Sequence, residues 1–293
     1  MTIQIHSIQT GVVHVKTDFL KGSIEAGGMV PFFGKLFTDK TWVDLPIYAW
    51  AIVHPEGVIV VDTGDRADTK SNFISQSTYS IQPEEEISAQ LLKLGIKTGD
   101  VSKIVLTHIH GDHANGMNQF PNTPVFLGER EYAIHKSRFG ATLNRIATRL
   151  PGWFDPKPLN FQPEPFATFD SSMRLTKAGD VIAVPTPGHT VGHTSIIVVA
   201  DNVHYFIAAD VTYNQQGLLD QLRQGPSLSP TEHSQTLGRI ITYAQQTPVV
   251  YLPAHDWESG ARLAAKQTVP TTLAAKAERQ NVADDNRAQP LRN

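Results

Sequence analysis

The first sixty residues show short runs of hydrophobic positions separated by turn-forming residues. The runs at residues 3–8, 12–15, 47–53 and 58–61 are rich in β-branched side chains, and a Pro-Glu-Gly sequence separates the last two. Runs of this length and composition are typical of β-strands. Because short turns between neighbouring strands favour antiparallel pairing, the pattern predicts that the chain begins with an antiparallel part of a sheet.

Two segments lack a regular pattern. Residues 18–45 mix glycines with phenylalanine and tryptophan at no clear period, and residues 137–161 contain three prolines and little periodicity. We interpret residues 18–45 as an ordered apolar loop. Both segments are candidate pocket walls, although such apolar side chains suit a ligand, ordinary core packing and a subunit contact equally.

Helical and strand patterns alternate in the rest of the chain. A helix is predicted from Pro83, where acidic residues occupy the first turn, to Gly95, and further helices are predicted over residues 129–136 and 230–246. The last begins with a capping-box spacing and a proline at its first position. Strand-rich halves flanked by helices predict an α/β (α+β) protein with an αββα sandwich. The later predicted strands are residues 103–107, 123–127, 181–184, 195–199, 204–208 and 249–252.

Length and composition are typical of a globular domain. The chain has 293 residues, of which 40% are hydrophobic and 18% charged. We predict a single domain over residues 1–270, with residues 18–45 as a loop insertion, and a polar tail over residues 271–293. No run approaches the roughly 18 apolar residues of a membrane helix, and no signal peptide is recognisable. These features predict a cytoplasmic protein without a membrane partner.

Cysteine content and charge exclude several kinds of chemistry. The chain has no cysteine, which excludes disulfides, thiolate metal sites and cysteine nucleophiles. The net charge is −3 and no dense basic run is present, so nucleic acid is not an expected partner. Any catalytic chemistry must therefore use oxygen and nitrogen groups.

The densest chemical signal is the sequence Thr-His-Ile-His-Gly-Asp-His, directly after a predicted buried strand. In an extended stretch, His108 and His110 project to the same side and can bind one metal ion. Gly111 permits a tight turn, after which Asp112 and His113 can face a second ion. A surface histidine cluster is the alternative, but the position after a strand favours metal binding.

Further ligands are available at other strand ends. His189 follows a predicted strand and a Pro-Gly turn, Asp210 ends another strand, and His255 ends a third. Each is weak evidence by itself, because a single histidine is more often a structural residue. Loops at strand ends gather at one edge of a sheet. Together with the first motif, these residues predict a metal centre.

These motifs resemble the metallo-β-lactamase superfamily of hydrolases. HxHxDH is followed by PGHTxGH, by an aspartate after a strand and by a late histidine, and the resemblance covers residues 45–260. The chain is most similar to N-acyl homoserine lactonases, in part because Tyr213 follows Asp210 by three residues. The resemblance implies a metallo-β-lactamase fold and, in similar lactonases, a homodimer. It also implies one metal held by His108, His110 and His189, another held by Asp112, His113 and His255, and Asp210 bridging both.

The resemblance implies roles for other side chains as well. Tyr213 would donate a hydrogen bond to the substrate carbonyl or leaving oxygen, and the alternative is a tyrosine that fills a loop. Asp112 would carry a proton near the leaving group. Asp62 would brace the metal loop, with a simple turn cap as the alternative, and His193 would pack or support the ligands. The histidines at positions 6, 14, 54, 135, 204 and 233 are interpreted as structural.

The expected cofactors are two divalent metal ions. Five imidazoles and two carboxylates suit Zn²⁺ first, and Co²⁺, Fe²⁺ or Mn²⁺ are chemically acceptable. Metal coordination lowers the pKa of a bound water to about 7, so hydroxide is available without a protein base. The expected reaction is attack of a metal-bridging hydroxide on the lactone ring of N-acyl homoserine lactones, a quorum-quenching activity with a small-molecule acyl lactone as substrate.

Other functions compete with this interpretation. Another hydrolase of the superfamily would act on other lactones, aryl esters, organophosphates or β-lactams, although β-lactamases with an Asp-Cys-His site are excluded by the missing cysteine. The short stretch after His255 argues against a glutathione-thioester hydrolase, and the absence of a basic extension argues against an RNA-processing enzyme. A binding module that had lost the reaction should lack ligands, whereas all seven positions are filled.

Overall fold

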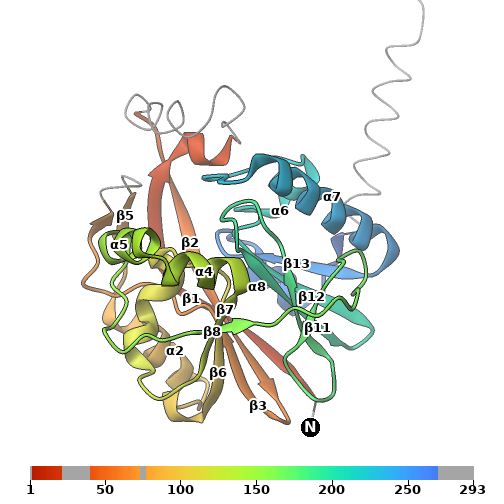
Figure 1. Ribbon diagram of the computed structural model, residues 1–293, viewed down its shortest axis with the longest axis horizontal. Helices are drawn as coiled ribbons and strands as arrows, with labels where there is room; N and C mark the ends of the chain where they lie inside the picture. The colour runs from red at the N-terminus through yellow and green to blue at the C-terminus, as the bar shows by residue number, and fades with distance from the viewer. Residues whose placement is uncertain (1, 22–39, 73–76, 270–293) are drawn as a thin grey trace, which may run out of the picture.

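Two β-sheets stacked face to face form the centre of the molecule, and helices lie on their outer sides (Figure 1). The computed structural model describes residues 2–21, 40–72 and 77–269. The α/β class and the predicted sandwich are confirmed. Within these described residues, no helix is long and apolar enough to cross a bilayer.

The first sheet combines an antiparallel and a parallel half. Its strand order is β4-β5-β1-β2-β3-β6-β7-β8. The predicted antiparallel start is confirmed, because β1 pairs antiparallel with β2 and β2 with β3, while β3, β6, β7 and β8 run parallel. The strands are β1 (Gln4–Lys16), β2 (Trp42–His54), β3 (Gly57–Val61), β4 (Ser71–Asn72), β5 (Ser77–Ser80), β6 (Val101–Leu106), β7 (Val125–Gly128) and β8 (Lys157–Leu159).

The second sheet has the order β13-β12-β11-β10-β9. Its neighbours pair antiparallel except β12 and β13, which run parallel and therefore end at the same edge. The strands are β9 (Met173–Arg174), β10 (Val181–Pro185), β11 (Thr194–Ala200), β12 (Val203–Ala209) and β13 (Val249–Pro253).

Helices cover the outer faces of both sheets. The α-helices are α2 (Ile87–Lys93), α3 (Gly111–Ala114), α4 (Glu129–Lys136), α5 (Arg138–Ala147), α6 (Gln215–Leu219), α7 (Pro230–Gln246) and α8 (Ser259–Ala265). Short 3₁₀ turns are η1 (Thr17–Leu20), η3 (Pro83–Glu85), η4 (Thr98–Asp100) and η5 (Asn115–Gln119).

Three apolar layers hold this arrangement together. One cluster joins α2 to the outer face of the first sheet and includes Ile87 and Leu91. A second lies between the two sheets, where Trp50 of β2 packs in the same cluster as Ile207 of β12. A third joins α7 to the second sheet and includes Ile240. Because burial of apolar surface is the main driving force for packing, the cluster between the sheets fixes how they lie against each other and so where their edges meet.

The structure corrects the two segments that lacked a pattern. Residues 18–45 are not a loop throughout, because η1 covers Thr17–Leu20 and β2 begins at Trp42. Residues 22–39 of that segment lie outside the described residues, and so does the predicted tail over residues 271–293. Residues 137–161 contain α5 and β8. A three-residue strand is too short to show a period, whereas Phe139, Leu143 and Ile146 do recur at the helical spacing that predicts α5.

The predicted strands at residues 3–8 and 12–15 are one continuous strand. β1 pairs with β2 along its whole length, and the register shifts between Gln9 and Val12. Gly11 lies inside this irregularity with a φ of +134°, a conformation that favours glycine. The break in the hydrophobic pattern therefore marks a β-bulge, not a turn.

Candidate metal centre

The turn that follows β6 carries the first group of candidate ligands. Buried His108 comes two residues after the end of the strand, and α3 begins at Gly111. The predicted tight turn at Gly111 is replaced by the start of this short helix. A Cβ atom at Gly111 would lie against the side-chain amide of Asn115, so a close approach explains the glycine. Asp112 and His113 therefore come from a helical turn.

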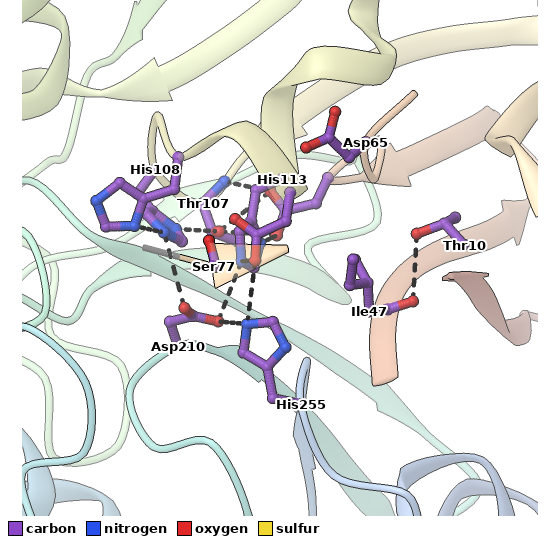
Figure 2. A network of polar contacts seen from close by, with 12 residues as sticks. Thr10, Ile47, Asp65, Ser77, Thr107, His108, His113, Asp210 and His255 are labelled. Carbon is purple, nitrogen blue, oxygen red and sulfur yellow. Dashed lines mark hydrogen bonds and ion pairs between the residues drawn. The ribbon is translucent and has the colours of Figure 1, made fainter. Parts of the chain in front are cut away.

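Three ends of the second sheet supply the remaining candidates. His189 follows β10, Asp210 follows β12 and His255 follows β13. Because β12 and β13 are parallel neighbours, the backbone N–H of Ala254 donates to the carbonyl of Ala209, which brings Asp210 close to His255. Figure 2 shows Asp210 and His255 facing His108 and His113, which follow β6.

The ligand atoms form two groups, and within each group all atoms lie within 4.8 Å of one another. In the first group, His110 Nδ1 lies 2.9 Å from His108 Nε2 and 3.0 Å from His189 Nε2. In the second, Asp112 Oδ2 lies 3.5 Å from His255 Nε2. The groups are His108, His110, His189 and Asp210, and Asp112, His113 and His255.

Asp210 lies between the two groups, with one carboxylate oxygen towards each. Its Oδ2 is 3.3 Å from His189 Nε2 in the first group. Its Oδ1 is 3.2 Å from His113 Nε2 and 3.3 Å from His255 Nε2 in the second. The structure thus brings together all seven residues that the sequence singled out.

Spacing and protonation fit metal coordination. Ligands of a tetrahedral zinc ion at about 2.0–2.1 Å lie about 3.3 Å from one another, which is the scale of these separations. His113 Nδ1 is bonded to Asp62, and His255 Nδ1 donates to the carbonyl of Pro46, so both Nε2 atoms are left for a metal. His113 Nε2 and Asp210 Oδ1 are buried without a hydrogen bond. The residues present therefore fit a divalent ion.

The first group favours neutral imidazoles. Burial lowers the pKa of His108 well below its ordinary value, and the neighbouring His113 and His110 lower it further. Burial likewise lowers the pKa of His189 well below the ordinary value, although the charge of Asp210 opposes this. Neutral imidazole is the form that binds metals, so these histidines are prepared for coordination.

In the second group, the neighbouring carboxylates outweigh burial in setting the pKa of His113. Burial by itself would lower the pKa of His113, but the charges of Asp210, Asp112 and Asp62 raise it well above the usual value. Burial would raise the pKa of Asp210, but His255 and His113 hold it well below its ordinary value. Asp210 is therefore ionised, and positive charge is favoured around it, as a bridging metal ligand requires.

Two buried side chains brace the ligands. Asp62 accepts hydrogen bonds from Thr107 N at 2.8 Å, from Thr107 Oγ1 at 2.8 Å and from His113 Nδ1 at 2.9 Å, so it is more than a turn cap. Burial lowers the pKa of His193 to about 3, and its neutral Nε2 accepts from Asp210 N at 3.4 Å. His193 Nδ1 then donates to Thr186. Both expected supporting roles are present as contacts.

Tyr213 lies beside the centre, in the loop after β12. Its ring packs edge-on to His255 at 4.9 Å between centroids and stacks on Phe19 at 6.5 Å. Gly225 has a φ of +70°, and a Cβ atom there would collide with the Tyr213 hydroxyl. Burial raises the pKa of Tyr213 well above its ordinary value, with the charge of Asp210 adding to the effect. The phenol is therefore a protonated donor.

Sequence reasoning missed two buried polar side chains that hold the site loops, Glu131 and Gln224, and it interpreted a third, His233, as structural without identifying its contacts. Gln224 Oε1 accepts from Tyr213 N at 2.8 Å, and His233 Nε2 donates to the carbonyl of Val211 at 2.7 Å. Their partners lie far away or in irregular loops, so no motif marks them. Glu131 lies on a predicted helix, where polar residues are common on solvated faces, and Gln224 lies in no predicted element.

Comparison with known families agrees with this geometry. The model of the metallo-beta-lactamase superfamily matches residues 42–255, which is most of the chain. The chain therefore belongs to the metallo-β-lactamase superfamily. The donor set described above fits the divalent metal ions that this family implies.

Individual relatives are more distant. A probable metallo-hydrolase of Mycobacterium bovis is 32% identical over 179 residues, covering 56% of this chain and 56% of that protein, so the match spans little more than half of its length. The N-acyl homoserine lactonase AttM of Azorhizobium caulinodans is 24% identical over 233 residues, covering 73% of this chain and 82% of AttM.

A solved structure shares the fold. An N-acyl homoserine lactone hydrolase with N-hexanoyl-L-homoserine bound at its catalytic metal centre superimposes with a TM-score of 0.66 at 19% identity, covering 88% of this chain and 95% of the other. At this identity the likeness shows the fold alone. The expected metallo-β-lactamase fold is confirmed.

Proposed function

We propose that this protein opens the lactone ring of N-acyl homoserine lactones by hydrolysis, using two divalent metal ions, Zn²⁺ first. The observation that carries the proposal is the pair of donor groups joined by Asp210, which offers one oxygen to each. The superfamily supplies the reaction class, and a relative named as an N-acyl homoserine lactonase, matched over 73% of this chain, supports the substrate class.

The residues divide between holding the ions and handling the substrate. When bound, two such ions lower the pKa of a coordinated water to about 7 and polarise a carbonyl. The protonated phenol of Tyr213 donates a hydrogen bond to the carbonyl or ring oxygen of the lactone, where negative charge develops. His108, His110 and His189 would hold one ion, Asp112, His113 and His255 the other, and Asp210 both.

Ring opening also requires a proton at the leaving oxygen. The Asp112 side chain is 15% exposed, whereas those of His113 and Asp210 are buried, so it is the carboxylate of the centre that faces solvent most. Its oxygen can accept a proton from the attacking water and pass it to the ring oxygen as the C–O bond breaks, so that this oxygen becomes the hydroxyl group of the opened product. The products are then an acyl homoserine carboxylate and one released proton.

A proton-release assay tests the substrate class. Metal-loaded protein is assayed with a pH indicator against acyl homoserine lactones of several chain lengths, simple lactones, an aryl ester, a phosphotriester and a β-lactam. We expect the highest kcat/KM on an acyl homoserine lactone. A higher kcat/KM on any other class would replace the proposed substrate with that class.

Elemental analysis tests the number of ions. We expect about two transition-metal ions per chain, since seven ligands exceed what one tetrahedral site uses. Asp210→Asn should lose metal and activity, while Asp201→Asn, an exposed aspartate paired with Lys266, should change neither. A metal-replete protein with one ion, fully active as Asp210→Asn, would disprove the dinuclear centre.

A further inference from the structure

Glu131 is a buried carboxylate for which the proposed chemistry has no role. It lies in the first turn of α4 and is 6% exposed. Its Oε1 accepts a hydrogen bond from Ile109 N at 3.2 Å, and its Oε2 accepts one from Thr190 Oγ1 at 2.9 Å. One side chain therefore connects two loops that are far apart in the sequence.

Both loops carry candidate ligands of the same group. Ile109 separates His108 from His110, and Thr190 follows His189 directly. These three histidines make up the first donor group together with Asp210. Glu131 thus holds the backbone between two ligands and the side chain next to the third, without contacting a ligand atom itself.

Close packing places α4 against the second of these loops. A Cβ atom at Gly192 would collide with the backbone of Glu131, and one at Gly128 would collide with the carbonyl of Gly192. The two glycines let the start of the helix and the loop approach each other directly. The distance that the Glu131 side chain spans is therefore set by backbone packing, which gives its carboxylate a fixed position.

The second donor group has a different support. Asp62 bonds to His113 of that group directly and reaches the first group only through Thr107, whose hydroxyl lies 3.0 Å from His108 Nδ1. Both hydrogen bonds of the Glu131 side chain go to the loops of the first group. Asp62 thus supports the second group directly and the first group through Thr107, whereas the hydrogen bonds of Glu131 go to the loops of the first group.

We infer that Glu131 is the positioning residue of the three-histidine group. Its loss weakens the binding of the ion held there, while the ion of the other group stays bound. The inference rests on the metal centre of the proposed function. Removing a hydrogen-bonding partner behind a metal ligand typically costs 10–100-fold in metal affinity. The hydrogen bonds act on geometry, so a side chain that preserves them should preserve the affinity.

The experiment is a chelator competition on metal-loaded full-length protein, with Glu131→Ala, Glu131→Gln and Glu129→Ala compared with wild type. Glu129 is an exposed neighbour on α4 that accepts a hydrogen bond from Phe161 N, outside the ligand loops, so it is the matched control. We expect Glu131→Ala to hold one ion about 10–100-fold more weakly. Glu131→Gln should remain close to wild type, because its amide can accept from Ile109 and donate to Thr190.

Two further measurements distinguish positioning from a general loss of structure. In cobalt-loaded protein, the metal-shifted imidazole N–H signals in proton NMR identify the half that loses its ion, because the halves contain three and two histidines. Urea unfolding of the metal-free protein reports stability separately. Equal weakening of both ions, or unchanged affinity in Glu131→Ala, would overturn the inference. A wild-type protein that holds a single ion would refute the dinuclear proposal. In that case, Glu131→Ala must still lower the affinity for an ion held by three histidines.

Discussion

Replacing Asp62 with asparagine should remove metal from the second donor group by changing the tautomer of His113. Asp62 has a φ of +59°, a conformation that asparagine tolerates, so the substitution leaves the backbone in place. The N–H of Thr107 lies 2.8 Å from Oδ1, which requires the remaining oxygen of asparagine to stay there. The new amide nitrogen then faces His113 Nδ1 in place of Oδ2.

The magnitude follows from the contacts. The Nδ1–H of His113 loses its charged acceptor, a hydrogen bond worth about 1.5–3 kcal/mol. The imidazole can recover a bond only by moving its proton to Nε2, the atom that lies 3.2 Å from Asp210 and is needed for the metal. We therefore expect a 10–100-fold loss of affinity for one ion, the effect typical of such supporting residues. The Glu131→Ala and Asp62→Asn variants should thus weaken metal binding in opposite halves of the centre.

Chelator competition measures the affinity, and urea unfolding of the metal-free protein measures the stability. Asp155→Asn is the control, because the Asp155 side chain is 80% exposed and pairs with Lys136 at the surface. That change should alter the free energy of unfolding by less than about 0.5 kcal/mol. If Asp62→Asn bound both ions with wild-type affinity, the tautomer argument would be refuted.

Three further outcomes are expected. Tyr213→Phe should keep both ions and its stack on Phe19 while lowering kcat on the best lactone by about 10 to 10³-fold; unchanged kcat and KM would make the tyrosine a packing residue. His255→Ala should cost more activity than Tyr213→Phe, because it loses metal, and metal analysis of the two variants checks this. Burial lowers the pKa of His233 from 6.5 to about 4, so protonation of this side chain favours the unfolded chain. The stability that neutral His233 contributes is complete above pH 6.5 and is lost as pH falls towards 4. The free energy of unfolding of the metal-free protein, measured with urea over this pH range, should therefore fall by up to about 3 kcal/mol more in wild type than in His233→Gln. Equal losses in the two proteins would contradict the argument.

Local patterns in the sequence predicted the elements whose signals are contained within a few residues. The helix at 230–246 agrees at both ends with α7, and the proline at its first position is consistent with where it starts, whereas the Ser229 side chain makes no cap hydrogen bond. The helix at 129–136 agrees with α4 as well. Two-residue strands such as β4 and β9, and the five-residue helix α6, were missed, since they are too short to show a period and form because neighbouring elements pack against them.

The sequence by itself also determined which side chains could form the metal centre, because ligand chemistry belongs to residue type and the HxHxDH spacing is local. Their separations are a tertiary property. His189 reaches within 3.0 Å of His110 across 79 residues, and His255 reaches Pro46 across 209. These distances depend on how two sheets stack and on the register of β12 against β13, which buried packing across the whole domain sets. The same reason hid Glu131: a glutamate on a helix becomes a support for metal ligands only once two distant loops have been packed against it.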